Sequence, residues 1–98
     1  MAIVMTLAPD ILDRIVDDFG ADAASAATSL LEQARSASPD LFSDRILRCA
    51  VYAAAGDLDR LRRAIELAHT DFRDLIVWAE YDNVFGDRKR DLTRPFSR

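Results

Sequence analysis

The chain has 98 residues and a formal net charge of −4; half of its residues are hydrophobic and 31% are charged. This length supports one hydrophobic core, and the composition excludes a disordered or fibrous chain. The single cysteine, Cys49, excludes an intramolecular disulfide and a cysteine-based zinc site. No apolar run approaches the ~18 residues of a membrane span, and the N-terminus lacks an export signal, so we expect a cytoplasmic protein.

The basic residues are almost all arginine, and Lys89 is the only lysine. Together with the many alanines, this skew is typical of GC-rich coding and favours a bacterial source. Charge is also unevenly distributed along the chain: residues 1–40 are strongly acidic, whereas residues 87–98 carry five basic and two acidic side chains. A basic tail on an acidic body can bind that body, another acidic protein or a nucleic acid.

Few glycines and prolines, and many alanines, leucines and arginines, favour long helices over strands. The first helix is predicted over residues 9–19, with Pro9 in its first turn and an apolar face that ends at Gly20. A second, alanine-rich helix is predicted over residues 22–37. Their inward-facing residues are expected to be Ile11, Leu12, Ile15, Val16, Phe19, Ala23, Ala27, Leu30, Leu31 and Ala34.

A third helix is predicted over residues 40–55, with Ser38 as its N-cap and Pro39 in its first turn. Gly56 and Asp57 then form a tight junction, in which the glycine takes a left-handed conformation and the aspartate caps the next helix. The inner face of the third helix is expected to carry Phe42, Ile46, Cys49, Ala50 and Ala53.

The fourth helix is predicted over residues 57–82 and would be the longest. Seven apolar residues recur in unbroken heptads, which is typical of a packed helix: Leu58, Leu61, Ile65, Ala68, Phe72, Leu75 and Ala79. Because residues 75–79 are apolar on every side, we expect this stretch to be buried all round, in the middle of the bundle or in a subunit interface.

The predicted fold is therefore all-α: a compact bundle of about four helices with a long central C-terminal helix and an irregular basic tail. We expect one helical-bundle domain over residues 1–86 and a flexible tail over residues 87–98, tethered at most by Phe96.

Glu66 and His69 have the Glu-x-x-His spacing of carboxylate-bridged di-metal bundles. Such a site needs ligands from four helices, and on the heptad wheel Glu66 points outward. Cys49 lies on a core-facing stripe, which favours a buried thiol over a nucleophile. We therefore assign no catalytic residue, metal or cofactor. A small enzyme or metal-binding protein built around Glu66, His69 and Cys49 is the first alternative.

Arg60, Arg62 and Arg63 follow a tight turn, as they would in a DNA-reading helix. The spacing of Arg63 from Asp59 and of Arg62 from Glu66 instead predicts surface ion pairs, which favours a solvated face. A nucleic-acid-associated protein that uses these three arginines and the basic tail is the second alternative.

The clearest functional indication is the aromatic side of the fourth helix, because Trp and Tyr are enriched at interface hot spots. The candidate interface consists of Leu67, Asp71, Asp74, Val77, Trp78 and Tyr81, with Arg73 available for a cross-pair. We predict a non-catalytic protein–protein interaction or regulatory module that binds either a second copy of itself, as a two-fold homodimer, or another helical protein. We expect no membrane partner.

Overall fold

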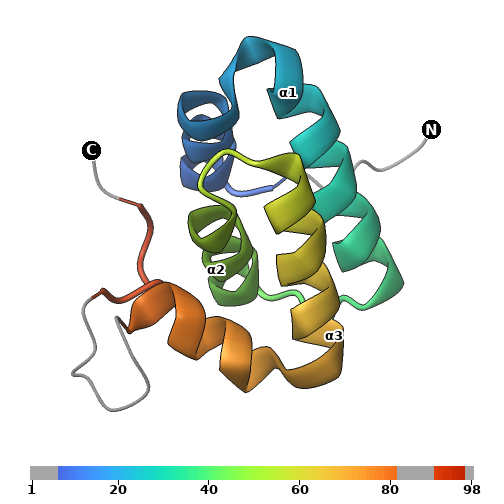
Figure 1. Cartoon of the computed structure of the whole chain (residues 1–98), viewed down its shortest axis with the longest axis vertical. Helices are drawn as coiled ribbons and strands as arrows, with labels where there is room; N and C mark the ends of the chain where they lie inside the picture. Colours follow the sequence, from blue (N-terminus) through green and yellow to red (C-terminus); the bar gives the residue numbers. More distant parts are fainter. Residues whose placement is uncertain (1–6, 82–89, 97–98) are drawn as a thin grey trace.

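The computed structural model describes residues 7–81 and 90–96. Within these residues the chain forms three helices and no strand: α1 (Pro9–Ala37), α2 (Asp44–Ala54) and α3 (Leu58–Glu80) (Figure 1). The radius of gyration is 12.8 Å, close to the ~13 Å of a folded chain of about 100 residues. The all-α, compact class is confirmed. The count of about four helices is not confirmed, because residues 9–37 form one element.

α1 changes direction at Gly20. This residue has φ 77° and ψ 166°, which is not helical and which residues with a Cβ rarely adopt. Figure 1 shows α1 doubling back on itself. The glycine therefore separates two helical segments at the position where the sequence predicts a boundary.

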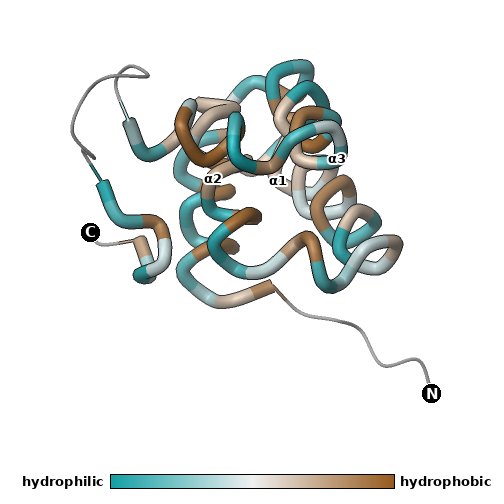
Figure 2. Tube along the Cα trace, turned by 90° about the horizontal axis from the view of Figure 1, so that it is seen from below, coloured by the Kyte–Doolittle hydropathy of each residue, from teal (hydrophilic) through white to brown (hydrophobic). Residues whose placement is uncertain are grey.

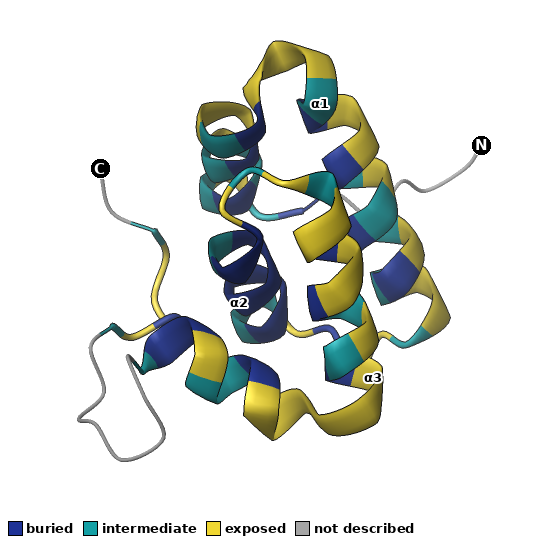
Figure 3. Cartoon of the chain, in the orientation of Figure 1, coloured by how far each residue is buried: buried dark blue, intermediate teal, exposed yellow. Residues whose placement is uncertain are grey.

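α2 is the central helix. All of its residues are buried except Asp44, Arg45 and Tyr52, and Figure 3 shows it enclosed by the more exposed α1 and α3. The prediction of a central C-terminal helix is therefore wrong. The short, apolar α2 takes that position because it has almost no charged outer face to keep in water.

The predicted start of this helix is also wrong. Ser38 ends α1 with a backbone hydrogen bond to Ala34 of 3.0 Å, and residues 39–42 form turns. Ser43 is the N-cap of α2, and its hydroxyl accepts a hydrogen bond of 3.4 Å from the N–H of Ile46. Ser38 and Ser43 are both followed by residues suited to the first turn of a helix. Because residues 39–42 form turns, the helix begins after Ser43 and not after Ser38.

The junction between α2 and α3 matches its prediction. Ala55 and Gly56 have φ of 50° and 83°, and the carboxylate of Asp57 accepts hydrogen bonds from the first N–H groups of α3. A Cβ on Gly56 would lie 2.3 Å from the carbonyl oxygen of Asp18. Only glycine therefore lets this turn lie against the first segment of α1.

α3 is not the straight helix that the heptad pattern predicts. Asp71 has φ −158° and ψ 98°, extended backbone that divides α3 into two helical segments. Its carboxylate accepts a hydrogen bond of 3.0 Å from the N–H of Arg73, so Asp71 caps the second segment. In Figure 1 this segment turns and runs across the end at which α2 begins.

The change of direction also leaves two aromatic residues of α3 exposed. Leu75 and Ala79 are buried, but Phe72 is 42% exposed and Trp78 is 38% exposed. The expectation that residues 75–79 are buried all round is therefore wrong: the second segment crosses α2 with one side and leaves the other to solvent.

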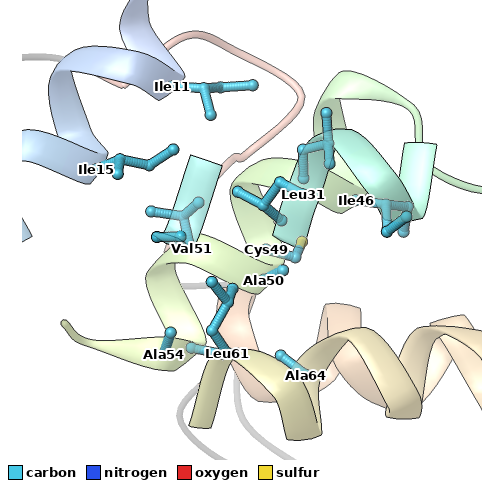
Figure 4. Close-up of a cluster of buried hydrophobic side chains, with 14 of the residues drawn as sticks. Ile11, Ile15, Leu31, Ile46, Cys49, Ala50, Val51, Ala54, Leu61 and Ala64 are labelled. Carbon is cyan, nitrogen blue, oxygen red and sulfur yellow. The ribbon is translucent and has the colours of Figure 1, made fainter. Parts of the chain in front are cut away.

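The core lies between α2 and the inner faces of α1 and α3 (Figure 4). Hydrophobic positions recur between hydrophilic ones along each helix in Figure 2. Val16, expected to face inward, is 54% exposed. The expected inward residues that are buried are Ile11, Ile15, Phe19, Ala27, Leu31, Ala34, Phe42, Ile46, Cys49, Ala50, Ala53, Leu61, Ala68, Leu75 and Ala79. Among the described residues, each helix is too short or too polar to cross a bilayer.

Candidate protein-interaction groove

A groove of about 500 Å³ opens where both segments of α3 and the first segment of α1 meet α2. Its lining combines two aromatic rings with two arginines and two aspartates; we call it the Trp78 groove. The lining residues are Arg14, Asp17, Asp18, Tyr52, Ala53, Ala55, Arg60 and Trp78. All three helices thus contribute to one surface.

Trp78 reaches this groove because α3 bends. The guanidinium carbon of Arg60, in the first turn of α3, lies 5.7 Å from the centroid of the Trp78 ring. In a straight helix these residues, 18 positions apart, would be ~27 Å apart along the axis. The break at Asp71 therefore creates the contact, a cation–π pair at a partly exposed site.

The six residues of the candidate interface do not form one continuous strip. Leu67 lies before the break in α3, whereas Val77 and Trp78 lie after it. Asp71 and Asp74 are exposed, and Leu67, Val77 and Tyr81 are half-buried. Of the six, Trp78 is the one that lines the groove. The sequence pattern does not predict that Tyr52 and Arg60 line the groove with it.

Phe72, the other exposed aromatic residue of α3, lies elsewhere. It lines a separate hollow of about 260 Å³ with Leu41 and Ile76. This hollow and the Trp78 groove share none of their lining residues.

The C-terminal segment, residues 90–96, contacts two of the residues that line the groove. The guanidinium carbon of Arg90 lies 4.4 Å from the centroid of the Tyr52 ring, and that of Arg14 lies 4.8 Å from the centroid of the Phe96 ring. Arg14 is itself held by a two-oxygen ion pair with Asp18, at 2.9 and 3.0 Å. Tyr52 and Arg14 thus belong both to the groove and to the surface that holds residues 90–96.

The same segment is anchored in the interior by a buried ion pair. Arg48 of α2 is 5% exposed and lies 2.9 Å from the carboxylate of Asp10 in α1. Its guanidinium also donates to the carbonyl oxygens of Leu92 and Thr93, at 3.3 and 3.4 Å, while Asp10 accepts from the N–H of Phe96 at 3.0 Å.

These contacts set the protonation of Asp10. Burial alone would raise the pKa of this carboxyl, because it disfavours the charged form. The hydrogen bonds from Arg48 and from the N–H of Phe96, together with the positive charge of Arg48, outweigh burial and hold the pKa of Asp10 below its ordinary value. Asp10 is therefore an anion at neutral pH.

The expectation that Phe96 alone tethers the tail is wrong. Leu92 is 4% exposed and belongs to the core. The N–H of Arg90 also donates to the carbonyl of Glu80 at 3.2 Å. Residues 87–89 and 97–98 of the predicted tail lie outside the described residues, as does Asp82, the predicted end of the fourth helix. The flexibility of the tail stays a prediction.

A second ion pair, between the partly exposed Arg45 and a buried glutamate, joins α2 to the end of α3. Glu80 is fully buried, and both of its carboxylate oxygens accept from the guanidinium of Arg45, at 2.8 and 2.9 Å. This hydrogen bonding raises the pKa of Arg45. The thiol of Cys49 lies 3.9 Å from the same carboxylate and is buried, as expected. Of this cluster, Arg45 also lines the hollow that contains Phe72.

Glu66 and His69 are both exposed, and they line a hollow of about 280 Å³ together with Leu30 and Ile65. The ring of His69 meets the buried ring of Phe42 edge-on, at 5.2 Å between centroids. Among the residues that the structure describes, no three His, Cys, Asp or Glu side chains are grouped so that they would hold a metal.

Two of the three arginines at the start of α3, Arg60 and Arg62, make contacts within the chain. Arg60 lies over Trp78, and Arg62 pairs with Asp59 at 2.9 Å. The predicted pairing of Arg62 with Glu66 is therefore corrected to Asp59, which is three residues away rather than four. Both spacings bring side chains together on a helix, so local sequence does not choose between them.

Comparison of the chain with protein-family models, with curated proteins and with solved structures found no match.

Proposed function

We propose that this chain is a non-catalytic protein-interaction module and that a segment of a partner protein binds in the Trp78 groove. The observation that carries the proposal is the exposure of Trp78 in a groove shared with Tyr52 and Arg60. Trp, Tyr and Arg are the residue types that dominate the binding free energy of protein interfaces. An aromatic side chain in a concave site also provides a pocket in which a partner side chain loses contact with water.

Contacts that orient the side chains of the groove support this function. Arg14 pairs with Asp18, and Arg60 lies over Trp78. Side chains that are already ordered lose little conformational entropy when a partner binds.

A second copy of the chain is the other occupant that we consider. A two-fold contact through Trp78 and Tyr81 would cover the exposed part of both aromatic rings. The sequence composition supports a bacterial, cytoplasmic protein for either form of the module.

The proposal is tested by comparing three baits: the wild type, Trp78→Ala and Phe72→Ala. Phe72 is the matched control, because it is an exposed aromatic residue of the same helix in a different hollow. A partner of the groove should bind the wild type and Phe72→Ala alike and bind Trp78→Ala at least about 30-fold more weakly, the effect of losing a hot-spot side chain of about 2 kcal/mol.

Quantitative mass spectrometry of proteins captured from the native host measures these ratios, and purified partners give the affinities. Light scattering at high micromolar concentration reports a homodimer, which Trp78→Ala should convert to monomer. If all three baits retain the same proteins and the wild type is monomeric, the groove is not an interaction site.

A further inference from the structure

The surface that holds residues 90–96 has the organisation of a peptide-binding site. Arg48 donates to two consecutive carbonyl oxygens of the segment, those of Leu92 and Thr93, and Asp10 accepts from the N–H of Phe96. One buried ion pair thus provides both a donor and an acceptor for the main chain of the segment. Contacts to main-chain groups fix a bound peptide without reading its side chains.

Three side chains of the segment supply the remaining recognition. Arg90 stacks on Tyr52, Leu92 is buried, and Phe96 packs on the guanidinium of Arg14. The side chains between Leu92 and Phe96 are exposed. The segment also keeps its own turn, because the carboxylate of Asp91 accepts from the N–H of Thr93 at 3.0 Å.

We propose that Asp10, Arg14, Arg48 and Tyr52 form a peptide-binding site, the Arg48 site, and that residues 90–96 are its resident ligand. The site takes a turn-forming segment with an arginine, a leucine two positions later and an aromatic residue four positions after the leucine. A partner protein that carries this pattern displaces the resident segment.

The inference rests on the proposed function in its last step, because the displacing partner is the one that also enters the Trp78 groove. The two sites are contiguous: Tyr52 and Arg14 line the groove and also contact Arg90 and Phe96. While residues 90–96 are in place, they engage Tyr52 and Arg14, which also line the groove, so partner binding and release of the segment are coupled.

The test uses the full chain and a synthetic peptide of the sequence of residues 90–96, acetylated, amidated and fluorescently labelled. Leu92→Asp places a charge at the buried anchor and releases the resident segment without altering the Arg48 site. Fluorescence anisotropy should then show binding to Leu92→Asp at least tenfold tighter than to the wild type. A tenfold ratio means that the segment occupies its site in about nine of ten wild-type molecules.

Two controls define the specificity. A peptide in which the leucine is replaced by aspartate should bind neither protein. The double variant Leu92→Asp, Tyr52→Ala should lose the tight binding, because the arginine of the peptide has no ring to stack on. Circular dichroism establishes that each variant keeps its helices. If Leu92→Asp does not fold, Phe96→Ala, which removes a half-buried ring, replaces it with the same expected direction.

Equal affinity of the peptide for the wild type and for the folded variant would overturn the inference, as would the absence of binding to both. The introduction of Trp78→Ala into the Leu92→Asp chain separates the two proposals. The peptide should still bind, because the contacts of residues 90–96 described above involve Asp10, Arg14, Arg48 and Tyr52 and not Trp78. If the peptide fails to bind while Trp78-dependent capture persists, the groove proposal stands alone; the converse result leaves the Arg48 site alone.

Discussion

The carboxylate of Asp10 and the guanidinium of Arg48 lie 2.9 Å apart, although 38 residues separate them in the chain. The pair joins the first turn of α1 to the central helix α2, and each partner also binds the main chain of residues 90–96. This ion pair therefore both stabilises the packing of α1 on α2 and holds the C-terminal segment.

Replacing Asp10 with Asn should lower the free energy of unfolding by about 2–3 kcal/mol at neutral pH, because the charge of Arg48 is left buried without its counter-ion. The pH dependence has a definite sign. Since the pKa of Asp10 is lowered by folding from an ordinary value of 3.8, its stabilisation is present above that value and is lost as the pH falls through the lower folded-state pKa.

Urea unfolding at pH 7 and pH 3 measures this prediction. The wild type should lose more stability between the two pH values than Asp10→Asn, and the exposed control Asp74→Asn should follow the wild type. Equal losses in wild type and Asp10→Asn would show that the carboxylate is not preferentially stabilised in the folded chain.

Arg45 and Glu80 should behave as a coupled pair. Arg45→Met leaves the fully buried carboxylate without its guanidinium and should cost about 3 kcal/mol of stability. The double variant Arg45→Met, Glu80→Leu removes both charges and should be more stable than the Arg45→Met single variant. Chemical unfolding of the two single variants and the double variant gives the coupling energy. Additive losses would contradict the pairing.

Gly56→Ala should be more destabilising than Gly20→Ala. Both glycines have positive φ, which costs about 1–3 kcal/mol for a residue with a Cβ. At Gly20 a Cβ meets nothing within 4 Å, whereas at Gly56 it would lie 2.3 Å from the carbonyl oxygen of Asp18. We expect a loss of more than about 3 kcal/mol for Gly56→Ala. Equal thermal midpoints for the two variants would mean that the turn does not approach α1 this closely.

Much of the helical fold is predictable from the sequence because its signals are local. Apolar periodicity identifies core residues such as Ile15 and Leu61, and the Gly56–Asp57 junction has the residue types of a helix end and a cap. The heptad run of α3 is misleading because a cap inside a helix competes with periodicity. Aspartate is a favourable N-cap residue, and the carboxylate of Asp71 accepts a hydrogen bond from the N–H of Arg73. This cap outweighs the apolar pattern, which continues on both sides of Asp71.

The candidate site is less predictable, because charged residues that pair across long sequence separations produce no periodic pattern in the sequence. From their residue types, Arg48 and Glu80 would be expected at the surface. Both are buried, and each pairs with a residue 38 or 35 positions away, Asp10 and Arg45 respectively. Trp78 is identifiable as an interface residue type from sequence. The positions of Tyr52 and Arg60 in the same groove result from the break in α3 and from the packing of the helices, which local sequence does not encode.

The central claim, that partners bind through the Trp78 groove, is tested most directly by nuclear magnetic resonance. The chain has one tryptophan, so a ¹⁵N-labelled sample gives a single indole N–H signal, from Trp78. On titration with a captured partner, this signal should shift or broaden in step with binding, together with the amides of Tyr52 and Arg60. An indole signal that stays unchanged at saturating partner, with shifts confined to other surfaces, would contradict the account.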